Sequence, residues 1–315
     1  MKLPIKNKIL ITDTLFIFPE HEQILLSAGF EIDRLDKPNA TEEELVERVQ
    51  GKIGYILGGM ERITDKVIEA ADELRVIAFT GSDARALIPA FDAATKKGIA
   101  ISSTPAANSY AVAEYTLALI LAMTRNIFEL GRTGSRKFQT THSLNELIVG
   151  IIGMGNIGTR VARAIKHLGA KEILYSSRTR KPEMEKELGF RYLSQEELLV
   201  QSDIVTLHVS KDAGDGFIGK KELGLMKNGA LLVNCGFIGG IEKEALFEEL
   251  KSGRLRAAQD EPMDERFNVL PLANWYCSNS HTAYNTYEAN KTASDMAIKS
   301  LLNLLSTGKD QFRLN

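Results

Sequence analysis

The sequence IVGIIGMGNIG, residues 148–158, decides the fold of the second half of the chain. Its first five residues form a short apolar run, which is typical of a buried strand. A helical pattern follows directly after the last glycine. The GxGxxG pattern therefore lies between a strand and a helix, and this is the context that a dinucleotide-binding turn requires.

Each glycine of this pattern has an expected task. We expect Gly153 to make the tight turn, Gly155 to let the backbone approach a pyrophosphate, and Gly158 to let helix and strand pack closely. The phosphates would lie at the amino terminus of the helix, so Asn156 and Ile157 are counted with the glycines as cofactor contacts. The alternative is a turn with a purely structural role.

The polar loop after the next predicted strand indicates which dinucleotide is bound. Residues 175–181 read YSSRTRK and contain no acid, whereas an NAD site places Asp or Glu there to accept hydrogen bonds from the ribose. Ser177, Arg178 and Thr179 are predicted to bind a ribose 2′-phosphate instead. NADP(H) is therefore the preferred cofactor and NAD(H) the alternative, and a solvated basic loop without a ligand stays open.

Strands and helices alternate on both sides of this unit. Before it, short apolar runs predict strands at residues 8–12, 31–35, 55–57, 75–79 and 99–102. After it, they predict strands at residues 172–175, 204–208 and 231–234. Strand, helix and strand at this spacing predict parallel βαβ units, so both halves belong to the α/β class.

Composition restricts the class of partner. The formal net charge of −2 gives no general attraction to nucleic acid or to an anionic membrane. Cys235 and Cys277 form no CxxC motif and no Cys/His cluster, so no metal site is predicted. The apolar segment 110–130 contains charged residues and is predicted as one buried or interface helix, not as a membrane span. We expect a cytoplasmic protein.

Several further motifs carry a resemblance to a known family. The motifs are Pro105 with VAE at 112–114, the glycine turn, DIVTLHV at 203–209, LMKNGA at 225–230, Asn234 with AL at 245–246, and HTAYNTYEA at 281–289. In these motifs the chain resembles the D-2-hydroxyacid dehydrogenases, and among them the glyoxylate/hydroxypyruvate reductase and phosphoglycerate dehydrogenase-like branches.

The resemblance implies a domain arrangement. It predicts two Rossmann-like open parallel-sheet domains with a cleft between them that holds the active site. A dinucleotide-binding domain at 104–287 would be inserted into a flavodoxin-like substrate-binding domain made of 1–103 and 288–315. It also implies a small-molecule substrate and a homodimer formed through the helix at 110–130.

The resemblance also assigns roles to single residues. His281 matches the acid/base histidine, and Glu261, followed by a proline, matches the carboxylate that would stabilise its protonated form. Asp260 either contacts the nicotinamide amide or takes the carboxylate role itself. The complete set of cofactor contacts predicted beyond the glycine turn and its loop is His208, Val209, Cys235, Gly236, Asp260, His281 and Ala283.

One expected residue is missing. The family places an arginine, which binds the substrate carboxylate, three residues after the asparagine matched by Asn234, and Phe237 stands there. Phenylalanine cannot form a charge-assisted fork to a carboxylate. Substrate contacts are otherwise predicted from backbone N–H groups in two loops, at Gly58 and Gly59 and at Thr80 and Gly81. Arg85 and Arg256 are weaker candidates for a replacement charge, with surface exposure the alternative for Arg85.

Two functions follow from this pattern. The first is an NADP(H)-dependent oxidoreductase that transfers hydride between nicotinamide and a 2-oxo/2-hydroxy acid or related carbonyl compound, with altered substrate specificity because of Phe237. The second is a dehydrogenase-like protein that binds nucleotide as a sensor or interaction module without catalysis. The histidine motif favours the first, and the missing arginine favours the second.

Overall fold

The chain forms two compact units, each with its own parallel sheet. The computed structural model describes residues 7–12, 17–37, 39–134, 139–278 and 282–315. Unit 1 consists of Met1–Asn108 and Thr286–Asn315, and unit 2 is Ser109–Asn285. The two-domain α/β class expected from the sequence is confirmed, while the cleft between the domains stays a prediction.

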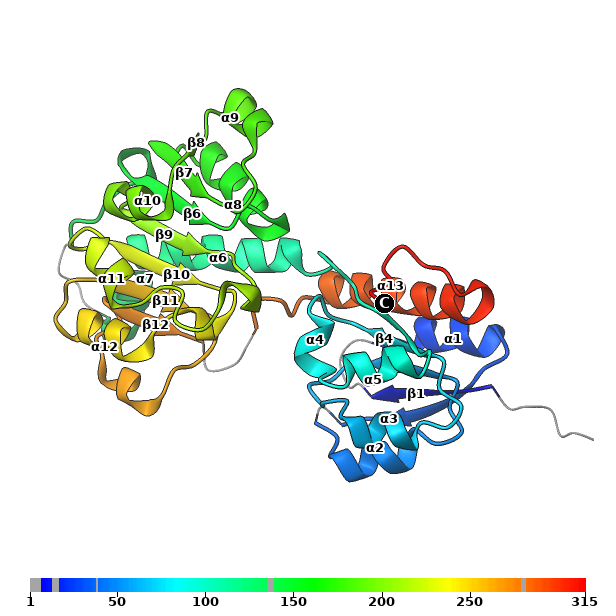
Figure 1. Cartoon of the computed structure of the whole chain (residues 1–315). Helices are drawn as coiled ribbons and strands as arrows, with labels where there is room; N and C mark the ends of the chain where they lie inside the picture. The colour runs from blue at the N-terminus through cyan, green and yellow to red at the C-terminus, as the bar shows by residue number, and fades with distance from the viewer. Residues whose placement is uncertain (1–6, 13–16, 38, 135–138, 279–281) are drawn as a thin grey trace, which may run out of the picture. The chain divides into compact units, whose positions relative to one another are not determined.

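Unit 1 is built on a five-stranded sheet of order β2-β1-β3-β4-β5. Its strands, all paired in parallel, are β1 (Lys8–Thr12), β2 (Glu31–Leu35), β3 (Gly54–Leu57), β4 (Val76–Phe79) and β5 (Ala100–Ser102). Its helices are α1 (Pro19–Ser27), α2 (Glu42–Arg48), α3 (Asp65–Ala70), α4 (Ala84–Leu87), α5 (Phe91–Lys96) and the last helix, α13 (Tyr287–Thr307). In Figure 1 the first segment of this unit is coloured from blue to cyan, and its last helix, α13, is orange to red. The chain reverses its direction of winding between β1 and β3, where sheets of this order bind their ligands.

The core of unit 1 explains why its sheet reads as apolar runs. Both faces of β1, β3 and β4 are buried, as expected of a parallel sheet covered by helices. One face packs against α13, which contributes Ala297, Ile298, Leu301 and Leu304 to a core shared with β1 residues Ile9 and Ile11. The sheet therefore needs the end of the chain for one of its layers.

Unit 2 is built on a seven-stranded sheet of order β12-β11-β10-β9-β6-β7-β8. Its parallel strands are β6 (Ile148–Ile152), β7 (Glu172–Ser176), β8 (Arg191–Tyr192), β9 (Ile204–Leu207), β10 (Leu231–Asn234), β11 (Arg256–Gln259) and β12 (Trp275–Cys277). The α-helices are α6 (Ser109–Thr124), α7 (Ile127–Thr133), α8 (Asn156–His167), α9 (Pro182–Leu188), α10 (Gln195–Gln201), α11 (Lys220–Leu225) and α12 (Lys243–Lys251). The 3-10 turns are η1 (Leu144–Glu146), η2 (Lys211–Ala213), η3 (Ile238–Gly240) and η4 (Glu265–Val269). The reversal of winding falls between β6 and β9.

The apolar segment 110–130 forms two helices, so the prediction of one continuous helix is wrong. α6 ends at Thr124, and α7 starts after Asn126, whose φ of 53° is left-handed. The Arg256 guanidinium donates hydrogen bonds to the Met123 carbonyl and to Asn126 Oδ1, and so satisfies groups at the end of α6. In the described part of the chain no single helix is long and apolar enough to cross a membrane; α6 and α7 together have that length and composition but are bent by 64°.

Candidate functional site

The turn between β6 and α8 contains two glycines that the fold itself requires. Gly153 has a φ of +98°, and a Cβ there would lie less than 3.0 Å from the carbonyl oxygen of His208. A Cβ at Gly158 would likewise lie less than 3.0 Å from the carbonyl oxygen of Gly153. Both positions therefore exclude a side chain because protein backbone occupies the space.

Gly155 has no such reason to be glycine. Among the described residues nothing lies within 4 Å of the position that its Cβ would take, and its backbone is extended, with φ −81° and ψ −156°. It is the residue that immediately precedes α8, whose first turn begins with Asn156 and Ile157. A bare backbone at the amino terminus of a twelve-residue helix suits an anionic group such as a pyrophosphate, because N–H donors and the positive end of the helix dipole face it.

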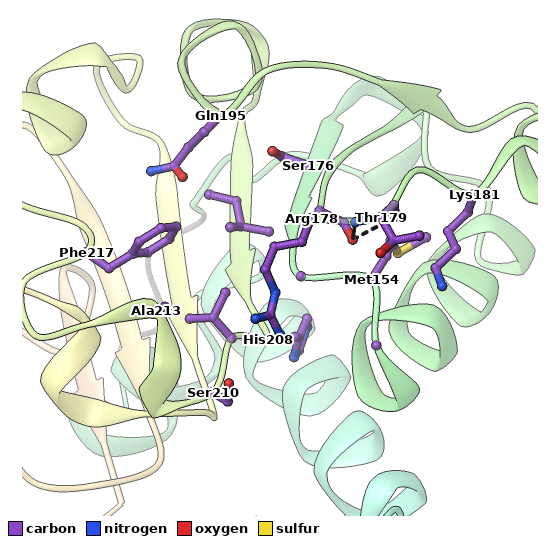
Figure 2. Close-up of a pocket in the computed structure, with 15 residues that line it drawn as sticks. Met154, Ser176, Arg178, Thr179, Lys181, Gln195, His208, Ser210, Ala213 and Phe217 are labelled. Carbon is purple, nitrogen blue, oxygen red and sulfur yellow. Dashed lines mark hydrogen bonds between the residues drawn. The ribbon is translucent and has the colours of Figure 1, made fainter.

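A cavity of about 600 Å³ opens beside this turn (Figure 2). Fifteen described residues line it: Ile152, Gly153, Met154, Gly155, Ser176, Ser177, Arg178, Thr179, Lys181, Gln195, His208, Val209, Ser210, Ala213 and Phe217. None of these is acidic, and two, Arg178 and Lys181, are cationic. The cavity thus joins the glycine turn to the loop after β7, as a dinucleotide site needs.

The loop after β7 divides its cations between two tasks. Arg180 forms a two-pronged ion pair with Glu185 of α9, at 2.8 Å from Nε to Oε1 and 2.6 Å from Nη2 to Oε2. Arg178 and Lys181 have no side-chain partner among the described residues, and both line the cavity. Figure 2 shows Arg178 extending from the loop past His208, while Gln195 and Phe217 stand on the other side of the cavity. Arg180 does not line it.

His208 directly follows β9, and its backbone carbonyl lies beside Gly153 in the glycine turn. Burial lowers the pKa of its imidazole to about 3, so the ring is neutral at pH 7. Its Nε2 lies 3.1 Å from Thr206 Oγ1, and its backbone N–H donates to the carbonyl of Ile152 at 2.7 Å. His208 therefore contributes shape and polarity to the cavity but no positive charge.

The turn after β10 is organised by Asn234. Its Oδ1 accepts the N–H of Gly236 at 3.0 Å, and its Nδ2 donates to the carbonyl of Phe237 at 3.2 Å. Burial raises the pKa of the neighbouring Cys235 thiol to about 12, which keeps it protonated and unreactive as a nucleophile. Cys235 and Gly236 lie at the carboxyl edge of the sheet, outside the lining of the cavity described above.

Asp260, directly after β11, ties together the segment that leads to α13. Its buried carboxylate accepts the backbone N–H groups of Thr282 and Ala283, at 3.0–3.1 Å, and the hydroxyl of Ser278 at 3.1 Å. These bonds occupy both carboxylate oxygens. Asp260 therefore holds Ser278, Thr282 and Ala283 close to the end of β11.

Of the predicted acid/base pair, only Glu261 lies among the residues that the structure describes. Glu261 is half-buried, and its backbone carbonyl accepts a hydrogen bond from Gln259 Nε2 at 2.7 Å. His281 lies outside the described residues. Its pairing with Glu261 therefore stays a prediction.

Comparison with known proteins places this geometry in a family. Residues 117–282 match the family model "D-isomer specific 2-hydroxyacid dehydrogenase, NAD binding domain". Glyoxylate reductase from Aeropyrum pernix is 33% identical over 311 residues, which cover 91% of this chain and 90% of that enzyme. The chain belongs to the D-2-hydroxyacid dehydrogenase family. Members of this family are oxidoreductases that act on CH–OH groups, and the matched domain binds a nicotinamide cofactor.

The chain spans about half the length of the curated D-3-phosphoglycerate dehydrogenases that it matches. D-3-phosphoglycerate dehydrogenase from Methanocaldococcus jannaschii is 30% identical over 314 residues, which cover 95% of this chain but 57% of that protein. Among solved structures, the TT0316 protein from Thermus thermophilus superposes with a TM-score of 0.87 at 29% identity, covering 98% of this chain and 100% of that one. A glyoxylate reductase from Paecilomyes thermophila gives 0.83 at 26% identity, with 99% of each chain covered.

Phe237, the residue predicted to stand where the family has an arginine, lies in an apolar turn. Its side chain is half-buried, and its ring occupies the space beside Gly239, where a Cβ would overlap it. The loop from 235 to 241 contains no cation. The replacement of a family arginine at this position stays a prediction.

The predicted substrate loops lie at the carboxyl edge of the sheet of unit 1. Gly58 follows β3 and donates its N–H to the carbonyl of Thr12 at 3.0 Å, with Gly59 next in the chain. Thr80 follows β4 and donates its N–H to the carbonyl of Leu57 at 3.0 Å, and Gly81 comes after it. These loops are therefore neighbours at one edge, and their role in substrate binding stays a prediction.

The two candidate replacement arginines are both engaged elsewhere. Arg85 is 66% exposed, stacks over the Phe91 ring at 3.9 Å and lies 3.6 Å from Asp92. Arg256 is held at the end of α6, as described above, and also donates to the carbonyl of Ala273 at 3.0 Å. Neither geometry singles out a new partner for a substrate carboxylate.

The lining of the cavity includes residues that were not among the cofactor contacts predicted from the sequence. Lys181 could have been found, because it belongs to the same basic loop as Arg178. Gln195, Ser210, Ala213 and Phe217 carry no motif, since separate segments bring them to the cavity wall.

Proposed function

We propose that this protein is an NADP(H)-dependent oxidoreductase that transfers hydride between nicotinamide and a 2-oxo/2-hydroxy acid or a related carbonyl compound. One observation carries the cofactor preference: the cavity beside the glycine turn is lined by Arg178 and Lys181 and by no described acid. The family supports the hydride chemistry.

The charge balance of the cavity suits a phosphorylated ribose. An acid at the end of the second strand would accept hydrogen bonds from ribose hydroxyls and would repel a 2′-phosphate. Ser177 and Thr179 offer polar groups there, and Arg178 offers a guanidinium with no competing ion pair among the described residues. Charge-assisted bonds of this kind contribute more than neutral ones, so phosphate is the better match.

The remaining residues have proposed roles in the reaction. When bound, the cofactor supplies or accepts the hydride. The glycine turn would hold the pyrophosphate against the start of α8. The imidazole of His281 would hold the proton that a carbonyl oxygen takes up on reduction, and the carboxylate of Glu261 would stabilise its protonated form.

The substrate side of the proposal rests on Phe237. An apolar ring there cannot neutralise a carboxylate, so the backbone groups of the loops at Gly58–Gly59 and Thr80–Gly81 would bear more of the recognition. We expect that binding of the substrate relies less on its carboxylate than binding of a simple 2-hydroxy acid would. A cytoplasmic homodimer is part of the same proposal.

Binding and turnover measurements test the proposal. Titration of the purified protein, followed by nicotinamide fluorescence, is expected to show NADPH binding at least about tenfold tighter than NADH. A panel of 2-oxo acids and aldehydes should then give oxidation of NADPH at its nicotinamide absorbance, and this turnover should disappear in H281A. Binding of neither nucleotide would overturn the assignment, and tighter binding of NADH would overturn the cofactor preference.

A second function is favoured by one observation, the absence of any cation in the loop from 235 to 241. A protein that binds NADPH as a sensor or interaction module would not need that charge. NADPH binding with no turnover on any member of the panel would support this second function.

A further inference from the structure

Three side chains behind the cavity form one connected network. Tyr175, at the end of β7 and fully buried, donates its hydroxyl hydrogen to Glu185 Oε1 at 2.7 Å. The same hydroxyl oxygen accepts the backbone N–H of Lys181 at 2.7 Å. Glu185 also holds both prongs of Arg180. A single carboxylate therefore connects the strand, the loop and the first turns of α9.

The charge state of this network is fixed. The Arg180 guanidinium and then the Tyr175 hydroxyl lower the pKa of Glu185 to about 2, so the carboxylate is ionised throughout the neutral range. An ionised carboxylate only accepts hydrogen bonds, and both its oxygens are used. The planar fork of Arg180 restrains the direction of the bond, which a single contact would not do.

The network determines which cations of the loop face the cavity. Arg180 and the backbone of Lys181 are held on the α9 side, whereas the side chains of Arg178 and Lys181 line the cavity. Ser177 Oγ accepts the N–H of Thr179 at 3.4 Å and donates to its carbonyl at 3.0 Å, which closes a local turn around Arg178. The loop is thus fixed on both sides of the residue expected to meet a phosphate.

We propose that Glu185 is a positioning residue for NADP(H) selectivity: it holds Arg180 and, through Tyr175, the loop, so that Arg178 and Lys181 are presented to the ribose 2′-phosphate. The inference rests on the proposed function. Glu185 itself touches no part of the cofactor, and its effect should appear only for ligands that carry the 2′-phosphate. The competing possibility, that Glu185 withholds Arg180 from the phosphate, predicts the opposite sign.

The test compares E185Q with E187Q. Both substitutions remove one negative charge from α9, but Glu187 is exposed, and its one ion pair with a described residue is distant, at 3.8 Å from Arg163. Both variants should attract an anionic ligand slightly more strongly because of this lost charge. A difference between them therefore reports on the contacts of Glu185. The probes are 2′,5′-ADP and 5′-ADP, with NADPH and NADH as the complete cofactors, and the readout is the dissociation constant by calorimetry at fixed ionic strength.

For E185Q we expect 2′,5′-ADP and NADPH to bind about tenfold more weakly, while 5′-ADP and NADH change less than about twofold. E187Q should leave all four nearly unchanged. Y175F, which removes the hydroxyl bridge, should shift the same two ligands in the same direction, and R180Q added to E185Q should cause little further loss because the pair is already broken. Thermal unfolding of each variant shows whether it is folded.

Four outcomes would overturn the inference. Tighter binding of 2′,5′-ADP by E185Q would mean that Arg180 is a withheld phosphate ligand. Equal weakening of 2′,5′-ADP and 5′-ADP would mean a merely structural role. No preference of the unaltered protein for 2′,5′-ADP would remove the proposed function as well, whereas a strong preference that E185Q leaves intact would remove only the role of Glu185.

Discussion

The two sheets share a winding pattern but differ at the edge where their strands end. In unit 2, the carboxyl ends of β6 and β9 border a cavity of about 600 Å³ with two cations lacking partners among the described residues. In unit 1, the equivalent point between β1 and β3 carries a buried polar cluster, where Glu61 Oε1 accepts from the hydroxyls of Thr12 and Tyr55. The topology selects the edge, and the side chains decide its charge: two cations in unit 2 and a buried carboxyl group in unit 1.

The largest effect is expected from the turn that forms the edge of unit 2. In G153A the new Cβ must displace the His208 backbone at a φ of +98°, so we expect the free energy of unfolding to fall by about 2–4 kcal/mol, with loss of nucleotide binding. G155A is the control, because its Cβ has open space: stability should hold and NADPH affinity should fall. Denaturant unfolding and fluorescence titration measure both. A stable G153A that binds normally would contradict the steric account.

The next largest effect is expected on nucleotide affinity, from the cation Arg178 in the cavity of unit 2. We expect R178A to weaken NADPH binding by about 10- to 100-fold and NADH binding by less than about threefold, because only the former carries the 2′-phosphate. Lys186, an exposed cation on α9, provides the control variant K186A. Equal losses for the two nucleotides would show that Arg178 shapes the loop but does not bind the phosphate.

The buried carboxyl group of Glu61 in unit 1 should make the free energy of unfolding depend on pH. Burial raises the pKa of Glu61 above its ordinary value, so the folded state retains a proton that the unfolded state releases. The free energy of unfolding should therefore fall as pH rises from about 4.5 through the folded pKa, by roughly 1.4 kcal/mol per unit of pKa difference. E61Q should flatten this dependence, as measured by urea unfolding between pH 4 and pH 8. An unchanged slope in E61Q would assign the pH dependence to other groups.

The smallest effect is expected at Arg85. Because this side chain is exposed and lies against Phe91 and Asp92, R85A should change the free energy of unfolding by less than about 0.5 kcal/mol and turnover by less than about twofold. Steady-state kinetics on any accepted substrate checks this. A large rise in KM would instead show that Arg85 takes part in substrate binding.

Much of the frame could be predicted from sequence, because it depends on local patterns. The strand, turn and helix around Gly153 follow from an apolar run and glycine spacing, and the polar loop with Arg178 follows the next strand in the chain, β7. The break in the helix at Asn126 could not be predicted, because the polar groups at the break are bonded by Arg256, more than a hundred residues away in the chain. The separate positions of Arg178 and Arg180 could not be predicted either, although Glu185 is only five residues from Arg180, because three cations of the loop could have paired with it.

The membership of α13 in unit 1 has a consequence for synthesis. Residues 286–315 complete a sheet that begins at residue 8, so the ribosome makes one layer of that core last. Until then the nascent first segment exposes Ile9, Ile11 and Ile56 on one face of its sheet. Unit 2, continuous from 109 to 285, can therefore finish folding before the core of unit 1 is complete.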